Sequence, residues 1–546
     1  MSDLFEKYRF FIKCWSFVFG ITAAVFSFYM MIFYVGNHDF PFMRYGTALN
    51  SGVWEGRVTQ FVLPWLFLHG QVMPILGAFI GFIAFSLAVI LLAKWYGMPQ
   101  NSLPVVVFCL LVTLHPYIFS QLYYVHTVIS VLSWHLFGVL GCIFIWRFIE
   151  VRHFSLLIFG CFCWLFALFG YVPVLEMILV VSIGKFLQEV LAGKLTDKRF
   201  LKQGISYILI LAMVLVVYLL GIKILKVTRW INSSMYNVHS LSLYDAGKKF
   251  FSSLADPFSV LFEYLPYSSI KESILLFILS GLLLCVAFYR KKIWFSIGIL
   301  ISIFYVAFFL AYFSPYGIFW SIRIHALSVP YIAAILFVAV VVYGKKWHRN
   351  VMLLMAVIMI LGYVRIDFMA QKVWYLGTIQ DERAADRVRA VLLPKLNAGK
   401  HYRLAVVGNF YGRQKFAGWD ELSVMQRETY REYYGYGLYL NQFSSSGLFL
   451  YEPNNPVFGD AIYLGNYLKY VVINSNLDEY NRVNAGVFAR RFGDDKKELL
   501  SAADKLCAYP CKNFYYVGEK DIFLMVSDDD ISRLVLKWNI ENEGKY

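Results

Sequence analysis

The stretch QVMPILGAFIGFIAFSLAVILLA, residues 71–93, contains no charged side chain and is long enough to cross the hydrocarbon core of a bilayer as one helix. Comparable apolar runs recur up to residue 366. They lie at 13–35, 71–93, 102–120, 124–146, 154–171, 174–192, 204–222, 273–289, 293–312, 324–343 and 350–366. Of the 546 residues, 59% are hydrophobic and only 16% are charged. The sequence therefore predicts a polytopic α-helical membrane protein with about 11 transmembrane helices.

Basic residues indicate how these segments are oriented. Lys and Arg gather at the N-terminus and at alternate junctions between the segments. The junctions contain Lys94, Arg147 and Arg152, Lys194–Lys202, Arg290–Lys292 and Lys345–Arg349. Because such residues concentrate on the cytoplasmic side, we expect the N-terminus and these junctions in the cytoplasm of a bacterial inner-membrane protein.

The polar tail has a different charge balance from the apolar part. From Asp367 onward there are 23 basic and 23 acidic residues, so the net charge of +15 belongs entirely to the preceding residues. A neutral tail is not the basic surface that nucleic-acid binding requires. Membrane lipids are expected partners, and nucleic acid is not.

The same orientation places a set of loops and the tail on the outer face. Two domains are expected, 1–366 in the membrane and 367–546 in the periplasm, with a first outer loop at 36–70 and a large one at 223–271. The tail mixes strand-like runs with a helix-like run, which predicts a periplasmic α/β domain. The strand-like runs are RLAVVGNF (403–410), YLKYVVINS (467–475) and DIFLMVS (521–527), and the helix-like run is DERAADRVRAVLLPKL (381–396).

The tail also holds two of the eight cysteines, Cys507 and Cys511, in the sequence CAYPC. One such pair without further Cys or His nearby is a poor zinc site. In an oxidising compartment the pair is able to form a disulfide, and the sequence alone leaves its redox state open.

The first outer loop, GNHDFPFMRYGTALNSGVWEGR (36–57), is rich in ionisable residues. Asp39 stands two residues before Pro41, so it either caps a short helix or acts as a general base. Arg44 and Arg57 either contact lipid headgroups or bind a phosphate. Trp54 and Glu55 between them are candidates for substrate binding.

Three further outer features belong to the candidate site. Glu176 lies at the start of an apolar segment, where an acid needs a wet cavity, a partner or an interfacial position. Lys226 belongs to a cationic cluster that departs from the charge rule of the outer face. The stretch SPYGIFWSIRIH (314–325) contributes Tyr316 for substrate and Arg323 for a phosphate just below the interface.

An acid among several cations at the outer membrane surface suits transfer of a sugar from a lipid-linked phosphate. A carboxylate accepts the proton of the incoming sugar hydroxyl, and Arg or Lys stabilises the departing phosphate. The sequence contains no Walker loop, HExxH or GxSxG motif that would favour another chemistry.

The run HDFPFMRYGTALNSGVWEGR (38–57) resembles the first-loop signature of the Gtr-type (GtrII-like) O-antigen glucosyltransferases, in which an acidic pair precedes Arg, Gly, Trp and Gly-Arg. The matching positions are Asp39, Arg44, Gly46, Trp54, Gly56 and Arg57. This chain has His38 in place of the first acid, so either Asp39 or His38 is the candidate base, with Glu176 as a second acid. The resemblance implies a GT-C-like membrane fold, a polyprenyl-phosphate-linked glucose donor and an O-antigen acceptor.

The expected activity is therefore a polyprenyl-phosphate-sugar-dependent glycosyltransferase at the periplasmic face, acting on a lipid-linked O-antigen or another surface glycan. Expected partners include proteins that synthesise and flip the donor. No cofactor is implied, and involvement of a divalent metal stays open. The alternatives are a flippase or transporter for lipid-linked glycan, an O-antigen polymerase or ligase, and a structural assembly partner.

Overall fold

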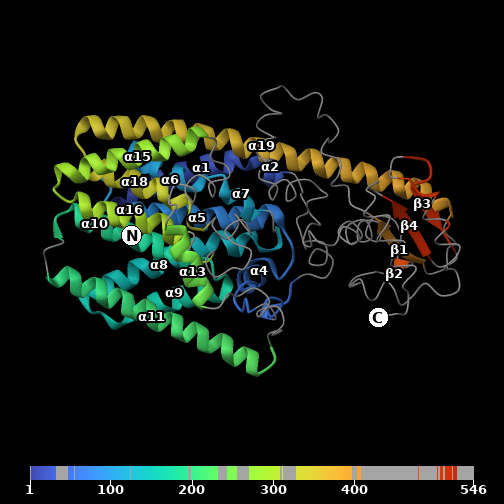
Figure 1. Cartoon of the computed structure of the whole chain (residues 1–546), viewed down its shortest axis with the longest axis horizontal. Coiled ribbons are helices and arrows are strands. Elements are labelled where there is room, and N and C mark those ends of the chain that lie inside the picture. Colours follow the sequence, from blue (N-terminus) through green and yellow to red (C-terminus); the bar gives the residue numbers. More distant parts are fainter. Residues whose placement is uncertain are drawn as a thin grey trace. The chain divides into compact units, whose positions relative to one another are not determined.

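The computed structural model describes residues 2–31, 47–53, 56–122, 125–194, 198–230, 243–254, 270–307, 310, 327–395, 402–407, 477–478, 501, 505–507, 511–518 and 521–525. The described helices up to Met369 form one compact unit (Figure 1). A second unit contains the described residues from Ala370 onward.

The first unit is an assembly of helices. Its helices are α1 (Ser2–Val25), α2 (Ser27–Met31), α4 (Val62–Leu68), α5 (Pro74–Trp95), α6 (Ser102–Thr113), α7 (Tyr117–Leu122), η2 (Val125–Thr127), α8 (Val128–Val151), α9 (Phe154–Gly170), α10 (Val174–Leu191), α11 (Lys198–Val227), α13 (Leu243–Leu254), α15 (Ile270–Tyr289), α16 (Ile293–Ala307), α18 (Pro330–Tyr343) and, up to Met369, α19 (Lys346–Leu392). Each of the eleven predicted apolar segments overlaps one or two of these helices.

Within the described residues, four segments are long and apolar enough to cross a membrane by length and composition. They are Pro74–Trp95, Val125–Val151, Leu201–Val227 and Lys346–Phe368. Five shorter apolar helices accompany them, in α6, α9, α15, α16 and α18. The mostly helical, apolar architecture fits a membrane protein.

Several helix boundaries differ from those expected. The predicted segment 350–366 is part of the 47-residue helix α19, which continues through the predicted helix-like run and ends at Leu392, before Pro394. Hydropathy marks where a span becomes polar, whereas this helix continues because no proline interrupts it. The predicted segment 102–120 is divided into α6 and α7 around Pro116.

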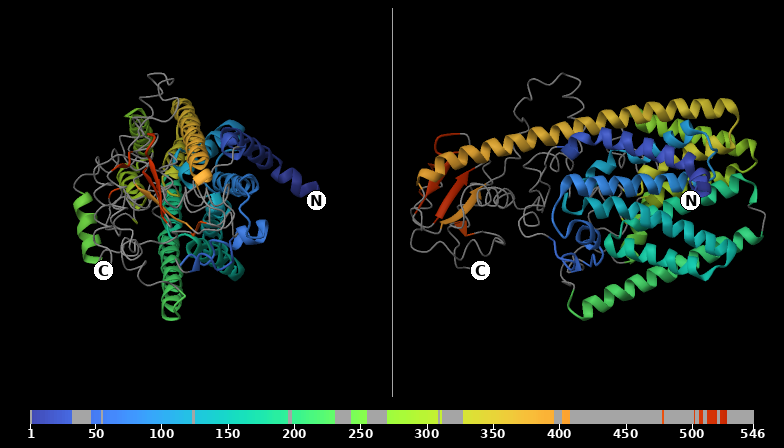
Figure 2. Two further views of the ribbon diagram at one scale, coloured as in Figure 1. Left: turned by 90° about the vertical axis from the view of Figure 1, so that its right-hand side faces the viewer. Right: turned by 180° about the vertical axis from the view of Figure 1, so that it is seen from behind.

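The core of the helical unit forms around α5 and α8, which lie side by side (Figure 2). The two helices run in the same direction, because contacts join their beginnings and also their ends. Near their beginnings a Cβ on Gly81 would lie 2.9 Å from Leu132 Cδ1, and near their ends the Trp95 and Trp146 rings are 6.1 Å apart. Small residues allow such close approach between apolar helices.

Helices α6 and α18 are buried along almost their whole length. A helix that is apolar on every face requires protein or lipid on all sides, and here neighbouring helices provide the cover.

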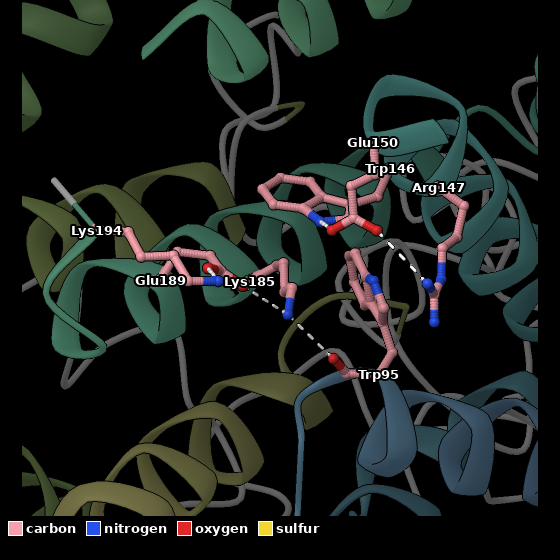
Figure 3. A network of polar contacts seen from close by, with 7 residues as sticks. All are labelled: Trp95, Trp146, Arg147, Glu150, Lys185, Glu189 and Lys194. Atoms are coloured by element: carbon pink, nitrogen blue, oxygen red, sulfur yellow. Dashed lines mark hydrogen bonds and ion pairs between the residues drawn. The ribbon is translucent and has the colours of Figure 1, made fainter. Parts of the chain in front are cut away.

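One end of the helical unit gathers basic residues, and we call it the basic end. At the ends of α5 and α10, Lys185 Nζ donates to Glu189 Oε1 at 2.9 Å and to the Trp95 carbonyl at 3.1 Å (Figure 3). Lys194 pairs with the other Glu189 oxygen. In the last turn of α8, the Trp146 indole donates to Glu150.

Helix α18 runs parallel to α10, because Ser328 contacts Glu176 near the start of both helices and Ile335 packs against Gly184 further along. Its last residue, Tyr343, therefore also lies at the basic end, where its carbonyl accepts from Arg290 Nη2 at 3.3 Å. The junctions predicted to share one side of a membrane thus lie at one end of the unit.

The described strands of the second unit form a four-stranded sheet in the order β2-β1-β4-β3. The strands are β1 (Tyr402–Val407), β2 (Leu477–Asp478), β3 (Tyr515–Val517) and β4 (Asp521–Met525). β1 is parallel to β2 and β4, and β3 is antiparallel to β4. Two predicted strand-like runs coincide with β1 and β4, and the run 467–475 lies outside the described residues.

Candidate functional site

Arg57 lies at the end of the helical unit opposite the basic end. Its loop is attached to the end of α9, because the Thr59 amide donates to the Phe169 carbonyl at 3.3 Å and the Thr59 hydroxyl donates to the Phe166 carbonyl at 2.5 Å. The half-buried Arg57 guanidinium lies over the Tyr171 ring, 5.5 Å from its centroid. An arginine on an aromatic face keeps its charge while its plane is fixed.

Tyr171 is in turn supported by α8. Its ring stacks on the buried Trp134 ring at 5.3 Å with an interplanar angle of 19°. Gly170 permits this arrangement, since a Cβ there would lie 2.3 Å from Trp134 Nε1. Arg57, Tyr171 and Trp134 therefore form a stack that joins the first outer loop to α8 and α9.

Glu176 lies five residues after Tyr171, in the first turn of α10, and is fully buried. The Leu310 amide donates to its Oε1 at 2.8 Å, and Ser328 Oγ lies 3.3 Å from its Oε2. Partial positive charge at a helix start favours an acid in this position. The sequence left open a wet cavity, a partner or an interfacial position for this acid, and among the described contacts the carboxylate has protein partners.

A second set of buried polar contacts involves Tyr331, His135 and Gln121, none of which was predicted from the sequence as a site residue. Tyr331 Oη, in the first turn of α18, lies 2.8 Å from His135 Nδ1, and His135 Nε2 lies 3.3 Å from Gln121 Oε1. All three side chains are buried. A histidine in the middle of an apolar segment is the sequence signal that would have drawn attention to it.

Lys226 is placed at the same end by the packing of α11 on α9. A Cβ on Gly221 would lie 2.6 Å from the Phe169 ring, so the last turn of α11 is near the end of α9. Lys226 lies in that turn and is partly exposed. Arg57, Glu176 and Lys226 thus share one end of the helical unit.

Sequence comparison establishes what kind of protein this is. A profile of the family described as Glucosyl transferase GtrII matches residues 28–343, which is more than half of the chain. The chain belongs to the GtrII glucosyltransferase family. No curated protein and no solved structure matches it.

Family membership confirms the resemblance noted in the first outer loop and makes the protein a glucosyltransferase. The matched range of this GtrII member contains the stack at Arg57, Glu176, the Tyr331–His135 pair and Lys226. The second unit lies beyond the match.

The remaining candidate residues of the glucosyltransferase come from the sequence alone. His38, Asp39, Arg44, Trp54, Glu55, Tyr316 and Arg323 all lie outside the described residues. Their proposed roles stay predictions from sequence.

The tail cysteines of this GtrII member are joined in the structure as a disulfide, with Cα atoms 6.1 Å apart. The Cys507 amide also donates to the Asn513 carbonyl at 3.1 Å. Over the part of the chain that the structure describes, no group of three or more His, Cys, Asp or Glu side chains is arranged to hold a metal ion.

Proposed function

We propose that the protein transfers glucose from a polyprenyl-phosphate donor to a lipid-linked O-antigen, or to another surface glycan, at the periplasmic face of the inner membrane. The family match over the membrane part carries this proposal. The basic end then faces the cytoplasm, and the opposite end, with Arg57 and Lys226, faces the periplasm.

The proposed reaction forms one bond to the anomeric carbon as another breaks. A hydroxyl oxygen of the acceptor attacks that carbon, its proton passes to Asp39, and the bond to the phosphate oxygen of the donor breaks. Polyprenyl phosphate leaves with the negative charge. The protein aligns the two substrates and stabilises the leaving phosphate.

Cations at this end suit the leaving phosphate. Arg57 is already oriented by Tyr171, and a planar guanidinium binds two phosphate oxygens at once. Arg44, Lys226 and Arg323 complete the proposed phosphate site. Trp54, Glu55 and Tyr316 are proposed to contact the sugars.

The test is glucose transfer by proteoliposomes containing the wild type or Asp39→Asn at equal protein level, with polyprenyl-phosphate glucose and lipid-linked O-antigen. Asp245→Asn, which changes an exposed acid on α13, is the matched control. We expect Asp39→Asn to lose about 10²- to 10⁴-fold in rate, as for removal of a general base, and Asp245→Asn to retain activity.

Equal rates in the wild type and Asp39→Asn would exclude Asp39 as the base and make His38→Gln the next variant. Absence of transfer by the wild type would contradict the proposed donor and acceptor. An assay for flipping of lipid-linked glycan would then test the transporter alternative.

A further inference from the structure

Two basic connections contact each other at the basic end of the helical unit. One joins α15 to α16, and the other joins α18 to α19 and continues into the first turn of α19. Arg290 Nη2 in the first donates to the Tyr343 carbonyl at the end of α18, and Lys345 Nζ in the second lies 4.2 Å from the centroid of the Tyr289 ring at the end of α15. The two connections, distant in sequence, therefore form one surface.

This surface carries six cations, and we call it the cationic surface. Its members are Arg290, Lys291, Lys292, Lys345, Lys346 and Arg349, and all except Lys292 are exposed. Within the described part of the chain none of them pairs with a carboxylate, whereas Lys185 and Lys194 at the same end share Glu189. Like charges gathered in one place repel one another. The cationic surface therefore favours an anionic ligand.

The end of α18 orients both arginines of this surface. Arg349 Nε donates to the Gly344 carbonyl at 3.1 Å, and Arg290 donates to the adjacent Tyr343 carbonyl at 3.3 Å. Cations are favourable beside the last carbonyls of a helix, so the two guanidiniums are held close together there. A guanidinium has five N–H donors, and those that remain suit the oxygens of a phosphate.

His348 in the first turn of α19 adds a donor without an acceptor. Its Nδ1 accepts from the Lys345 amide at 3.2 Å, so the proton of the neutral imidazole is on Nε2. That Nε2 is buried and has no hydrogen-bond partner in the described structure. Buried donors are rarely left unpaired in proteins, and an acceptor from outside the chain would satisfy this one.

The position of the cationic surface along the helices matches lipid headgroups. A segment long and apolar enough to cross a membrane begins at Lys346. Trp294 in the first turn of α16 and Trp347 in that of α19 are both exposed, and tryptophan prefers the boundary between headgroups and hydrocarbon. The cations therefore lie at the depth of phospholipid phosphates.

We propose that the cationic surface binds the headgroup of an anionic phospholipid. Arg290 and Arg349 hold the phosphate, the lysines surround it with positive charge, and the exposed tryptophans contact the lipid just below the headgroup. This site is separate from glucose transfer, because no residue proposed to bind donor or acceptor belongs to it.

The experiment measures binding of phosphatidylglycerol and phosphatidylcholine to the full-length protein in detergent by native mass spectrometry. The variant combines Lys292→Gln, Lys345→Gln and Lys346→Gln and keeps both arginines. We expect the wild type to prefer phosphatidylglycerol. The variant should lose at least about 10-fold in affinity for that lipid, since each cation near a headgroup contributes about five-fold, and should bind phosphatidylcholine as the wild type does.

The matched control combines Arg152→Gln, Lys198→Gln and Lys202→Gln. It removes the same charge from exposed cations in other connections. Its affinity for phosphatidylglycerol should stay within about two-fold of the wild type, and thermal unfolding shows that both triple variants are folded. Equal losses in the two triple variants would show attraction by net charge alone and would overturn the site. Equal affinity of the wild type for the two lipids would do the same.

Two further measurements test the arginines and the source of the phosphate. Arg290→Lys combined with Arg349→Lys keeps the charge but not the planar fork, so it should weaken phosphatidylglycerol binding several-fold. Unchanged binding would contradict the role of the oriented guanidiniums. Polyprenyl phosphate that displaces phosphatidylglycerol at a lower concentration would assign the surface to an isoprenoid lipid and contradict the phospholipid.

Discussion

At the scale of single residues, Arg57 shows how a loop residue becomes part of a rigid site. The loop backbone is hydrogen-bonded to α9 through Thr59, and the guanidinium lies on Tyr171. A long cationic side chain loses much conformational freedom when it binds a phosphate, and prior orientation reduces that cost. Arg57 is therefore the best-positioned cation among the described candidates.

We predict that Arg57→Ala lowers kcat/KM for polyprenyl-phosphate glucose by about 10²-fold. This is the range measured when an enzyme loses one hydrogen-bond donor that stabilises negative charge developing in the transition state. Arg57→Lys should lose less, about 10-fold, since it keeps the charge but not the planar fork. Transfer kinetics at several donor concentrations provide the measurement.

Arg147→Ala is the matched control for this change. Arg147 is a largely exposed cation at the basic end, 3.6 Å from Glu150, and such surface pairs contribute little to stability. Equal losses in Arg57→Ala and Arg147→Ala would show that Arg57 has no particular role in donor binding.

At the scale of secondary-structure elements, helices α8 and α9 support the stack of Arg57, Tyr171 and Trp134. The indole of Trp134 on α8 lies against Gly170 at the end of α9, and the next residue, Tyr171, stacks on the same ring. The position of Tyr171 thus depends on how closely the two helices approach. Glycine permits that approach because it lacks a Cβ.

We predict that Gly170→Ala destabilises the protein by about 1–3 kcal/mol through overpacking and also reduces glucose transfer. The added methyl group has to displace Trp134, and the stack of Tyr171 and Arg57 moves with it. Thermal unfolding in detergent and transfer kinetics test the two effects.

The control is Gly281→Ala on α15, where a Cβ would meet nothing within 4 Å. It should leave transfer unchanged and leave stability equal or higher, by up to about 1 kcal/mol from helix propensity. A Gly170→Ala protein as stable as Gly281→Ala would contradict the packing argument.

At the scale of the whole molecule, the basic junctions and the described site candidates lie at opposite ends of the helical unit. Basic junctions share one end, whereas Arg57, Glu176 and Lys226, the candidates that the structure describes, lie at the other. The disulfide of the second unit suits an oxidising compartment. If the basic end faces the cytoplasm and the opposite end faces the periplasm, the positions of the basic junctions and of the site candidates and the presence of the disulfide are all explained.

We predict that green fluorescent protein fused after Gly193 fluoresces in the cytoplasm, while alkaline phosphatase fused to the C-terminus of the full chain is active in the periplasm. Cys507 and Cys511 should resist alkylation in intact cells until a reductant is added, and Cys507→Ser should expose Cys511 without reductant. An inactive C-terminal phosphatase together with freely alkylated tail cysteines would reverse the assigned sidedness.

Much of the helical architecture was predictable because hydropathy is a property of local sequence. Every predicted apolar segment overlaps a helix, and the family resemblance of the first outer loop is confirmed. The extent of α19 was not predictable from hydropathy, since that signal ends where the helix becomes polar. Neither was the division into α6 and α7, where Pro116 interrupts an apolar run.

By itself, the sequence determined the helical membrane character, the grouping of basic junctions and the likeness to a transferase family, because composition and spacing express each of them locally. Only the tertiary structure decided that Arg57 lies on the Tyr171 ring and that His135 contacts Tyr331. The same holds for Glu176, whose carboxylate accepts hydrogen bonds from the Leu310 amide and the Ser328 hydroxyl. These partners are separated by more than a hundred residues, and their contacts depend on how the helices pack. No local pattern encodes which of these side chains meet, and helix packing is what brought the described ones together.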